Sequence, residues 1–316
     1  MRSFLAGLVC ALCVASAAMA SAEESGTREV VGILAATGEE MPLVQRLARA
    51  VGPAEGIRIL PVAGQGPVQS LTDLLQIKGI DAAVVPADTL DYMAQNELGE
   101  GVEGKLAYVV RLASLDLHLV ARRGITRFED LAGRTIVTGT TLGNSFVAGQ
   151  TVLAGLNPPP RLLAGDGASA LHAVASGQAD AALIVGRKPL AELRDVPAES
   201  GLHFIALTDG GASHYAPSLL TAEDYPQLVT GGQPVETLST GLVLAVFNWA
   251  EGTPQFERPR TIARAILAAL ARAGGEPDAI NLAAEVPGWA RHAAASEALS
   301  ELSSATPTTS EQAVEN

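Results

Sequence analysis

The stretch KLAYVVRLASLDLHLVAR (residues 105–122) decides the fold, because one series of strands and helices ends in it and another begins. KLAYVVRLA predicts a strand that closes the first series, and LDLHLVAR predicts a strand that opens the second. Strands that alternate with helices indicate a mostly parallel sheet covered by helices on both faces. Two such series predict an α/β fold of two lobes, joined by hinges near residues 112–116 and 207–213.

The first series precedes this stretch. Short apolar runs at EVVGILA (29–35), GIRILPVA (56–63) and IDAAVV (80–85) predict strands, each followed by a segment with helical periodicity. The third of these helices, ADTLDYMAQ (87–95), begins beside Asp88, a residue type that caps helix N-termini.

The second series builds a smaller lobe, which we place at 114–208. The strand VETLSTGLVLAVFNW (235–249) and the helix after it cannot form a core of their own, so we assign 209–302 with 27–113 to the first lobe. The last residues, 303–316, contain few apolar side chains and are predicted to be disordered.

The N-terminus has the pattern of a cleaved secretory signal. Arg2 precedes the apolar run FLAGLVCALCVASAAMA, and small residues follow, so we expect residues 1–22 to be removed and the protein to reach the periplasm. The alternative, a retained membrane anchor, requires a longer apolar segment. The two cysteines, Cys10 and Cys13, lie inside this signal, which leaves no cysteine for a disulfide, a metal site or a nucleophile.

Charge and motif content argue against several function classes. The chain carries 34 acidic and 21 basic residues, a formal net charge of -13, which disfavours nucleic-acid binding. The five histidines are scattered, and no phosphate-binding loop or nucleophile elbow occurs. We therefore expect no enzymatic activity, no cofactor and no bound metal.

Several longer segments resemble one receptor family. DLHLVARRGITRFEDLAGRTIVTGTTLGNS (116–145) and GASALHAVASGQADAALIVGRKPLAEL (167–193) resemble the second lobe of type-II periplasmic solute receptors. APSLLTAEDYPQLVTGGQPVETLSTGLVLAV (216–246) and VAGQGPVQSLTDLLQIKGIDAAVVPAD (62–88) are similar to the TAXI-type receptors of tripartite (TRAP) transporters. Each motif is loose, and the resemblance rests on their order along nearly the whole chain after the signal.

The resemblance implies a periplasmic binding protein type 2 fold with its ligand cleft at the hinge. It implies a receptor that captures a small polar ligand, with an organic acid or an amino acid favoured, and delivers it to the permease subunits of a membrane transporter. We expect it to be a monomer. Whether the partner is a TRAP or an ABC-type transporter stays open.

Candidate ligand residues lie in loops that follow strands, because ligands of open α/β sheets bind outside the carboxyl ends of the strands. Glycines there allow a close backbone approach, and small polar or charged side chains supply hydrogen bonds. The candidates are Thr37, Gly38, Glu39, Glu40, Gly64, Gln65, Ser70, Thr140, Thr141, Asn144, Ser145, Arg187, Lys188 and Tyr215.

Two of these groups have an equally good structural interpretation. Glu39 and Glu40 are first-turn carboxylates that favour a helix dipole wherever they point. Asn144 or Ser145 is suited to cap the helix that follows, as well as to contact a ligand.

The family resemblance departs from its usual pattern at Glu39, Glu40 and Met41, where small residues and a tyrosine are customary. If the glutamates face the cleft, an anionic ligand would be repelled, and the ligand would be neutral, a metal ion or a carrier of an ammonium group. If they face solvent, an organic anion at Arg187 or Lys188 is favoured. The departure also supports an alternative function, a periplasmic partner or chaperone of an enzyme or sensor with a degenerate cleft.

Overall fold

The computed structural model describes residues 28–36, 38–208, 214–274 and 280–305. The predicted signal, residues 1–22, lies outside these residues, as does most of the predicted disordered tail. The part of that tail which is described, residues 303–305, belongs to the helix α10 (Ala293–Ala305), so the prediction was wrong there. This helix packs Ala295 and Ala298 into the core, which explains why it continues to this point.

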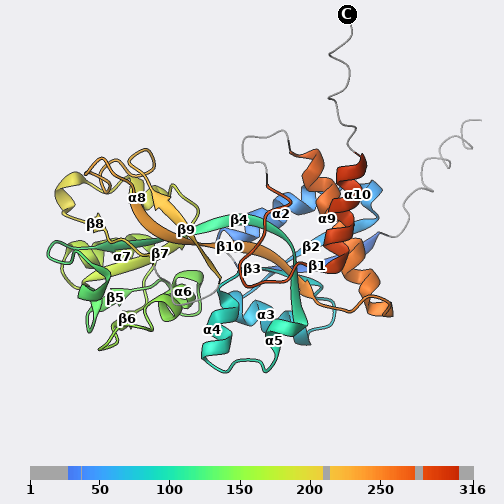
Figure 1. The fold of residues 1–316 in the computed structure, drawn as a ribbon, viewed down its shortest axis with the longest axis horizontal. Coiled ribbons are helices and arrows are strands. Elements are labelled where there is room, and N and C mark those ends of the chain that lie inside the picture. Colours follow the sequence, from blue (N-terminus) through green and yellow to red (C-terminus); the bar gives the residue numbers. More distant parts are fainter. Residues whose placement is uncertain (1–27, 37, 209–213, 275–279, 306–316) are drawn as a thin grey trace, which may run out of the picture.

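Within the described residues, one ten-stranded mixed sheet passes through both lobes (Figure 1). Its strands are β1 (Glu29–Ala35), β2 (Ile57–Ala63), β3 (Ala82–Pro86), β4 (Leu106–Ala121), β5 (Thr135–Val137), β6 (Arg161–Leu163), β7 (Ala181–Gly186), β8 (His203–Phe204), β9 (Tyr215–Leu220) and β10 (Val235–Phe247). The order is β2-β1-β3-β10-β4-β7-β5-β6, with β8 beside β4 and β9 beside β10. The predicted two-lobe α/β fold is confirmed.

The sheet is parallel only towards its two ends. β1 pairs in parallel with β2 and β3, and β5 pairs in parallel with β6 and β7. In the middle, β10 runs antiparallel to β3 and β4, and β4 runs antiparallel to β7. The mostly parallel sheets that we expected therefore form only the outer part of each lobe, because the two connecting strands run in opposite directions.

The two strands predicted in residues 105–122 are one strand, β4, of 16 residues. Helices and neighbouring strands cover it in both lobes, so nearly all of its side chains are buried. Its pairing with β10 skips Leu112, since Leu242 faces Ala113 and Val243 faces Arg111. This bulge is a local bend in the strand at the position predicted for a hinge.

In the first lobe, side chains alternate between two cores on the two faces of the sheet. Val31 and Ile33 of β1 point to α2 (Glu40–Ala50), α9 (Glu257–Arg272) and α10. Leu34 points to the opposite face, where α3 (Pro67–Gln76), α4 (Thr89–Gln95) and α5 (Val102–Lys105) lie. Both faces are therefore covered by helices, as the sequence predicts.

The second lobe has α6 (Asn144–Val152) on one face of its sheet and α7 (Gly167–Ala175) with α8 (Ala191–Arg194) on the other. The short 3₁₀ turn η2 (Phe128–Leu131) adds Leu131 to the core beside α6.

The boundary predicted at residue 208 is contradicted by the packing of the segment after it. Leu220 and Tyr225 belong to one core of the second lobe, together with Val120 and Val174. Leu238, at the start of β10, belongs to its other core. Residues 215–238 thus complete the second lobe, and the chain returns to the first lobe along β10. The other predicted boundaries stay predictions.

A fully buried histidine connects three elements of the second lobe. His118 of β4 lies with its Nδ1 3.2 Å from the Ile184 carbonyl oxygen and its Nε2 2.7 Å from the Tyr225 hydroxyl. Burial lowers the pKa of His118 to about 4, so the ring is neutral. Its Nδ1–H donates to the carbonyl, its Nε2 accepts from Tyr225, and that hydroxyl accepts from the Leu190 N–H at 2.9 Å. Every polar atom in this chain of hydrogen bonds is satisfied.

We predict that Tyr225→Phe lowers the free energy of unfolding by about 2 kcal/mol, because it leaves His118 and the Leu190 N–H unsatisfied in the core. Chemical denaturation of the two proteins measures the difference. Tyr92→Phe is the matched control, because it removes a tyrosine hydroxyl as well. The edge-on contact of the Tyr92 ring with Phe146 does not involve that hydroxyl and stays in place. Equal losses in both variants would contradict this role of the Tyr225 hydroxyl.

Candidate ligand cleft

Loops from both lobes meet where their strands end. The first lobe contributes the turn between β1 and α2 and the loop between β2 and α3; the second contributes the loop before α6 and the residue after β7. Direct contacts join them, although the partners are 104 and 148 residues apart in the chain. The carboxyl ends of parallel strands from the two lobes therefore face each other, at the position where open α/β sheets bind their ligands.

Glu39 reaches across this cleft to the main chain of the second lobe. Its Oε1 and Oε2 lie 3.2 and 3.4 Å from the Arg187 backbone nitrogen, which donates to them. Burial raises the pKa of Glu39, and the nearby carboxylates of Glu40 and Glu192 raise it further. The Arg187 N–H and the positive charge of Arg187 oppose this rise by stabilising the carboxylate.

Glu40 makes the second contact across the cleft. Its side chain is buried, and its Oε1 accepts a hydrogen bond from the Asn144 amide nitrogen at 2.5 Å. Both glutamates therefore point towards the opposite lobe, with Glu40 buried and Glu39 partly exposed.

The capping role considered for Asn144 and Ser145 is wrong. Gly143 is the N-cap of α6, and both residues lie in the first turn without a side-chain capping bond. Asn144 is instead free to reach Glu40, and the Ser145 hydroxyl accepts a hydrogen bond from the Val185 N–H at 3.0 Å. Asp88 likewise does not cap α4 through its side chain.

Glycines permit the close approach of the lobes. A Cβ on Gly66 would lie 2.4 Å from the Leu142 carbonyl oxygen of the other lobe, and the φ of Gly66 is 148°. A Cβ on Gly186 would lie 3.0 Å from Glu39 Oε1. Neither glycine was among the predicted site residues; each follows or ends a strand, which is the signal that could have identified it.

Other predicted residues lie apart from these contacts. Lys188 is held within the second lobe, where its Nζ lies 3.3 Å from Asp116, 3.0 Å from the Ser218 hydroxyl and 2.8 Å from the Leu219 carbonyl oxygen. It is therefore not available to an anion in the way that we expected. Thr37 lies outside the described residues, and Gly38, Gln65, Thr140, Thr141 and the Arg187 side chain are exposed.

Ser70 and Gly64 lie together on the first lobe. Ser70 is buried, and its hydroxyl has no hydrogen-bond partner among the described residues. A Cβ on Gly64 would lie 2.5 Å from that hydroxyl. The absence of a side chain at Gly64 therefore provides the space that the Ser70 hydroxyl occupies.

A buried polar cluster, which sequence reasoning missed as a site, ties α4 to β9 and β10. Asp88 accepts a hydrogen bond from the Tyr215 hydroxyl at 2.8 Å, and its N–H donates to the Thr240 hydroxyl at 3.2 Å. His214 lies beside it, with Nδ1 2.6 Å from Asp91. Burial raises the pKa of Asp88 to about 6; the Asp91 carboxylate also raises it, while the Tyr215 hydrogen bond and His214 act in the opposite direction. Tyr215, predicted to contact a ligand, here supports the junction between the lobes.

We predict that Asp88→Asn removes a stabilisation that the protein gains in acid. The pKa of Asp88 is above its ordinary 3.8 in the fold, so the folded state binds this proton more tightly than the unfolded state. The stabilisation is present near pH 4 and is lost as the pH rises through about 6. Between pH 7.5 and 4.5, denaturation should show the wild type gaining about 2 kcal/mol relative to the variant. Parallel pH profiles would contradict this.

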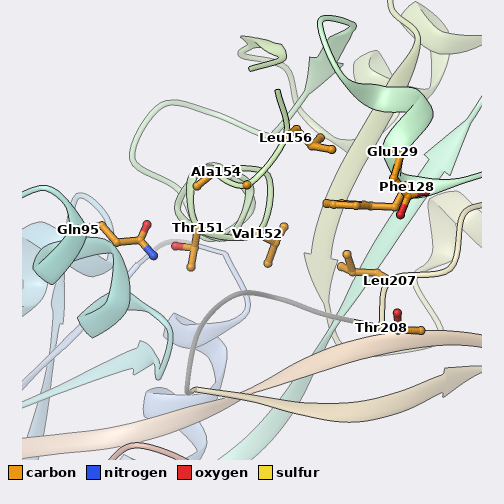
Figure 2. A pocket seen from close by; sticks show the side chains of 10 residues that line it. Gln95, Phe128, Glu129, Thr151, Val152, Ala154, Leu156, Leu207 and Thr208 are labelled. Atoms are coloured by element: carbon orange, nitrogen blue, oxygen red, sulfur yellow. The ribbon is translucent and has the colours of Figure 1, made fainter. Parts of the chain in front are cut away.

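A separate pocket of about 620 Å³ opens between the end of α4 and the end of α6 (Figure 2). Its walls combine polar and apolar side chains and include none of the predicted ligand residues. The residues that line it are Gln95, Phe128, Glu129, Thr151, Val152, Ala154, Gly155, Leu156, Leu207 and Thr208.

The described residues contain no group of three or more histidine, cysteine, aspartate or glutamate side chains placed to hold a metal ion. None of the helices in this part of the chain is both long and apolar enough to cross a bilayer.

No protein-family model matches the chain, and no curated protein sequence does. Among solved structures, the periplasmic aliphatic sulphonate binding protein SsuA from Escherichia coli is 16% identical, with a TM-score of 0.44 over 79% of this chain and 76% of SsuA. XAC2383 from Xanthomonas citri, bound to ATP, is 13% identical, with a TM-score of 0.46 over 87% and 95%. The L-cystine solute receptor of Neisseria gonorrhoeae is 15% identical, with a TM-score of 0.38 over 82% and 97%.

Proposed function

We propose that this protein is a periplasmic solute-binding receptor that captures a small polar ligand between its lobes and delivers it to a membrane transporter. The observation that carries this proposal is the meeting of polar loops from both lobes across one cleft, at Glu39 with Arg187 and at Glu40 with Asn144. Loops at the carboxyl ends of strands are where open α/β sheets bind their ligands. We continue to expect a monomer.

A hinge between the lobes would let a ligand enter and leave. β4 and β10 pass from one lobe to the other as a pair, and the bulge at Leu112 interrupts their pairing there. Small changes in a few backbone angles at such a position can move two lobes as rigid bodies.

The orientation of the glutamates favours an amino acid over a purely anionic organic acid. Two like charges 4 Å apart repel by about 4 kcal/mol at the effective dielectric constant of a protein surface. An ammonium group would instead be attracted to Glu39 and Glu40. The segments 62–88 and 216–246 support the permease of a TRAP transporter as the partner, because they resemble TAXI-type receptors.

We infer that the protein is not an enzyme. His118, a residue of the type that acts as a general base, is buried with both ring nitrogens hydrogen-bonded inside the core. A general base must be able to reach a substrate, and this ring does not.

The second candidate, a partner protein with a degenerate cleft, is favoured by one observation. Glu39, Glu40, Asn144 and the Arg187 N–H form hydrogen bonds with one another across the two lobes. In that case the surface of the protein, and not its cleft, would carry the function.

Thermal unfolding after refolding from denaturant, which removes any carried ligand, tests the receptor. We expect one of a panel of amino acids, polyamines, dicarboxylates and divalent metal ions to raise the Tm by several degrees. A ligand at 100 times its Kd adds about 2.7 kcal/mol. An increase in Tm with an amino acid or a polyamine supports a contact between the ammonium group of the ligand and the carboxylates of Glu39 and Glu40. No shift with any compound would favour the partner protein.

A further inference from the structure

The donors in the cleft belong to the second lobe. Arg187 is the first residue after β7, and its N–H points across the cleft to Glu39. Asn144 is the first residue of α6, and its amide nitrogen points to Glu40. A backbone N–H after a strand and an amide at a helix start are groups that would bind the carboxylate of a solute.

The acceptors are carboxylates of the first lobe. Glu39 is the N-cap of α2 and Glu40 its first residue, so the helix dipole stabilises their negative charge. Both carboxylates occupy the donors at hydrogen-bonding distance. A carboxylate solute cannot reach the same donors until these contacts break.

Close packing surrounds the two contacts. Gly66 lies against the Leu142 carbonyl group, and Gly186 lies against Glu39. Tyr92 of α4 and Phe146 of α6 meet edge-on with ring centroids 6.4 Å apart. The lobes thus touch at these positions as well as at the glutamates, in a closed arrangement in which Glu39 contacts the Arg187 N–H directly.

The local charge also opposes an anion. Glu192 lies near Glu39 and adds a third carboxylate, whereas Lys188 is paired with Asp116. Arg187 is the cation whose charge acts on Glu39.

From these contacts we propose that Glu39 and Glu40 act as a built-in substitute for a carboxylate ligand: they hold the lobes closed without a solute and exclude organic dianions from the cleft. The exclusion of dianions rests on the proposed receptor function, but the closure does not. A solute can enter only when the contacts of Glu39 with Arg187 and of Glu40 with Asn144 break. The glutamates therefore set both the resting conformation and the specificity.

Hydrogen exchange of the Arg187 amide, followed by NMR in the ligand-free full-length protein, tests the closure. We expect the amide to be protected in the wild type and to exchange at least tenfold faster in Glu39→Ala/Glu40→Ala. Asn144→Ala breaks one contact while it keeps both charges, and it should give an intermediate rate. Glu100→Ala/Glu223→Ala, which removes two exposed glutamates elsewhere, should leave the rate unchanged.

An unprotected Arg187 amide in the wild type, or equal protection in the double variant, would overturn the closure. Far-ultraviolet circular dichroism shows whether each variant is folded. If Glu39→Ala/Glu40→Ala does not fold, the comparison of Asn144→Ala with the wild type decides the closure.

Calorimetric titration with succinate tests the exclusion. We expect binding by Glu39→Ala/Glu40→Ala to be at least tenfold tighter than by the wild type. Equal affinities would overturn the exclusion. If amide protection behaves as expected and no solute of any class binds either protein, the closure stands and the receptor function fails.

Discussion

The antiparallel pairing of β4 with β10 is the constraint on which the rest of the structure depends. These two strands run through both lobes and lie at the centre of the one sheet. Every other strand attaches to one side of this pair or the other. Because the two strands stay hydrogen-bonded along most of their length, the loops of the two lobes are held opposite each other and in contact.

The opposed loops of the two lobes place Glu39 and Glu40, at the start of α2, against the second lobe. In an isolated lobe, Glu39 and Glu40 would be ordinary first-turn carboxylates beside a helix N-terminus. In the whole molecule they face the end of β7 and the start of α6, where Arg187 and Asn144 donate to them. The carboxylates thus satisfy donors that would otherwise be available to a ligand.

The sequence identified many of the residues at the interface of the two lobes but few of the contacts that they make. The loop after a strand is visible in a local pattern, so Glu39, Glu40, Asn144 and Arg187 could be named in advance. The pairing of Lys188 with Asp116 and of Tyr215 with Asp88 could not, because the partners are 72 and 127 residues apart. Gly66 and Gly186 carry the local signal of a strand end, but their contact with a backbone or side chain of the other lobe is not visible in the sequence.

By itself, the sequence determined the succession of strands and helices and the division of the chain into two α/β lobes. Hydrophobic periodicity reports which side of each element is buried, and that information is local. Only the tertiary structure decided that β4 is continuous, that residues 215–238 complete the second lobe, and that the glutamates face the cleft. These features depend on contacts between distant segments, which periodicity does not encode.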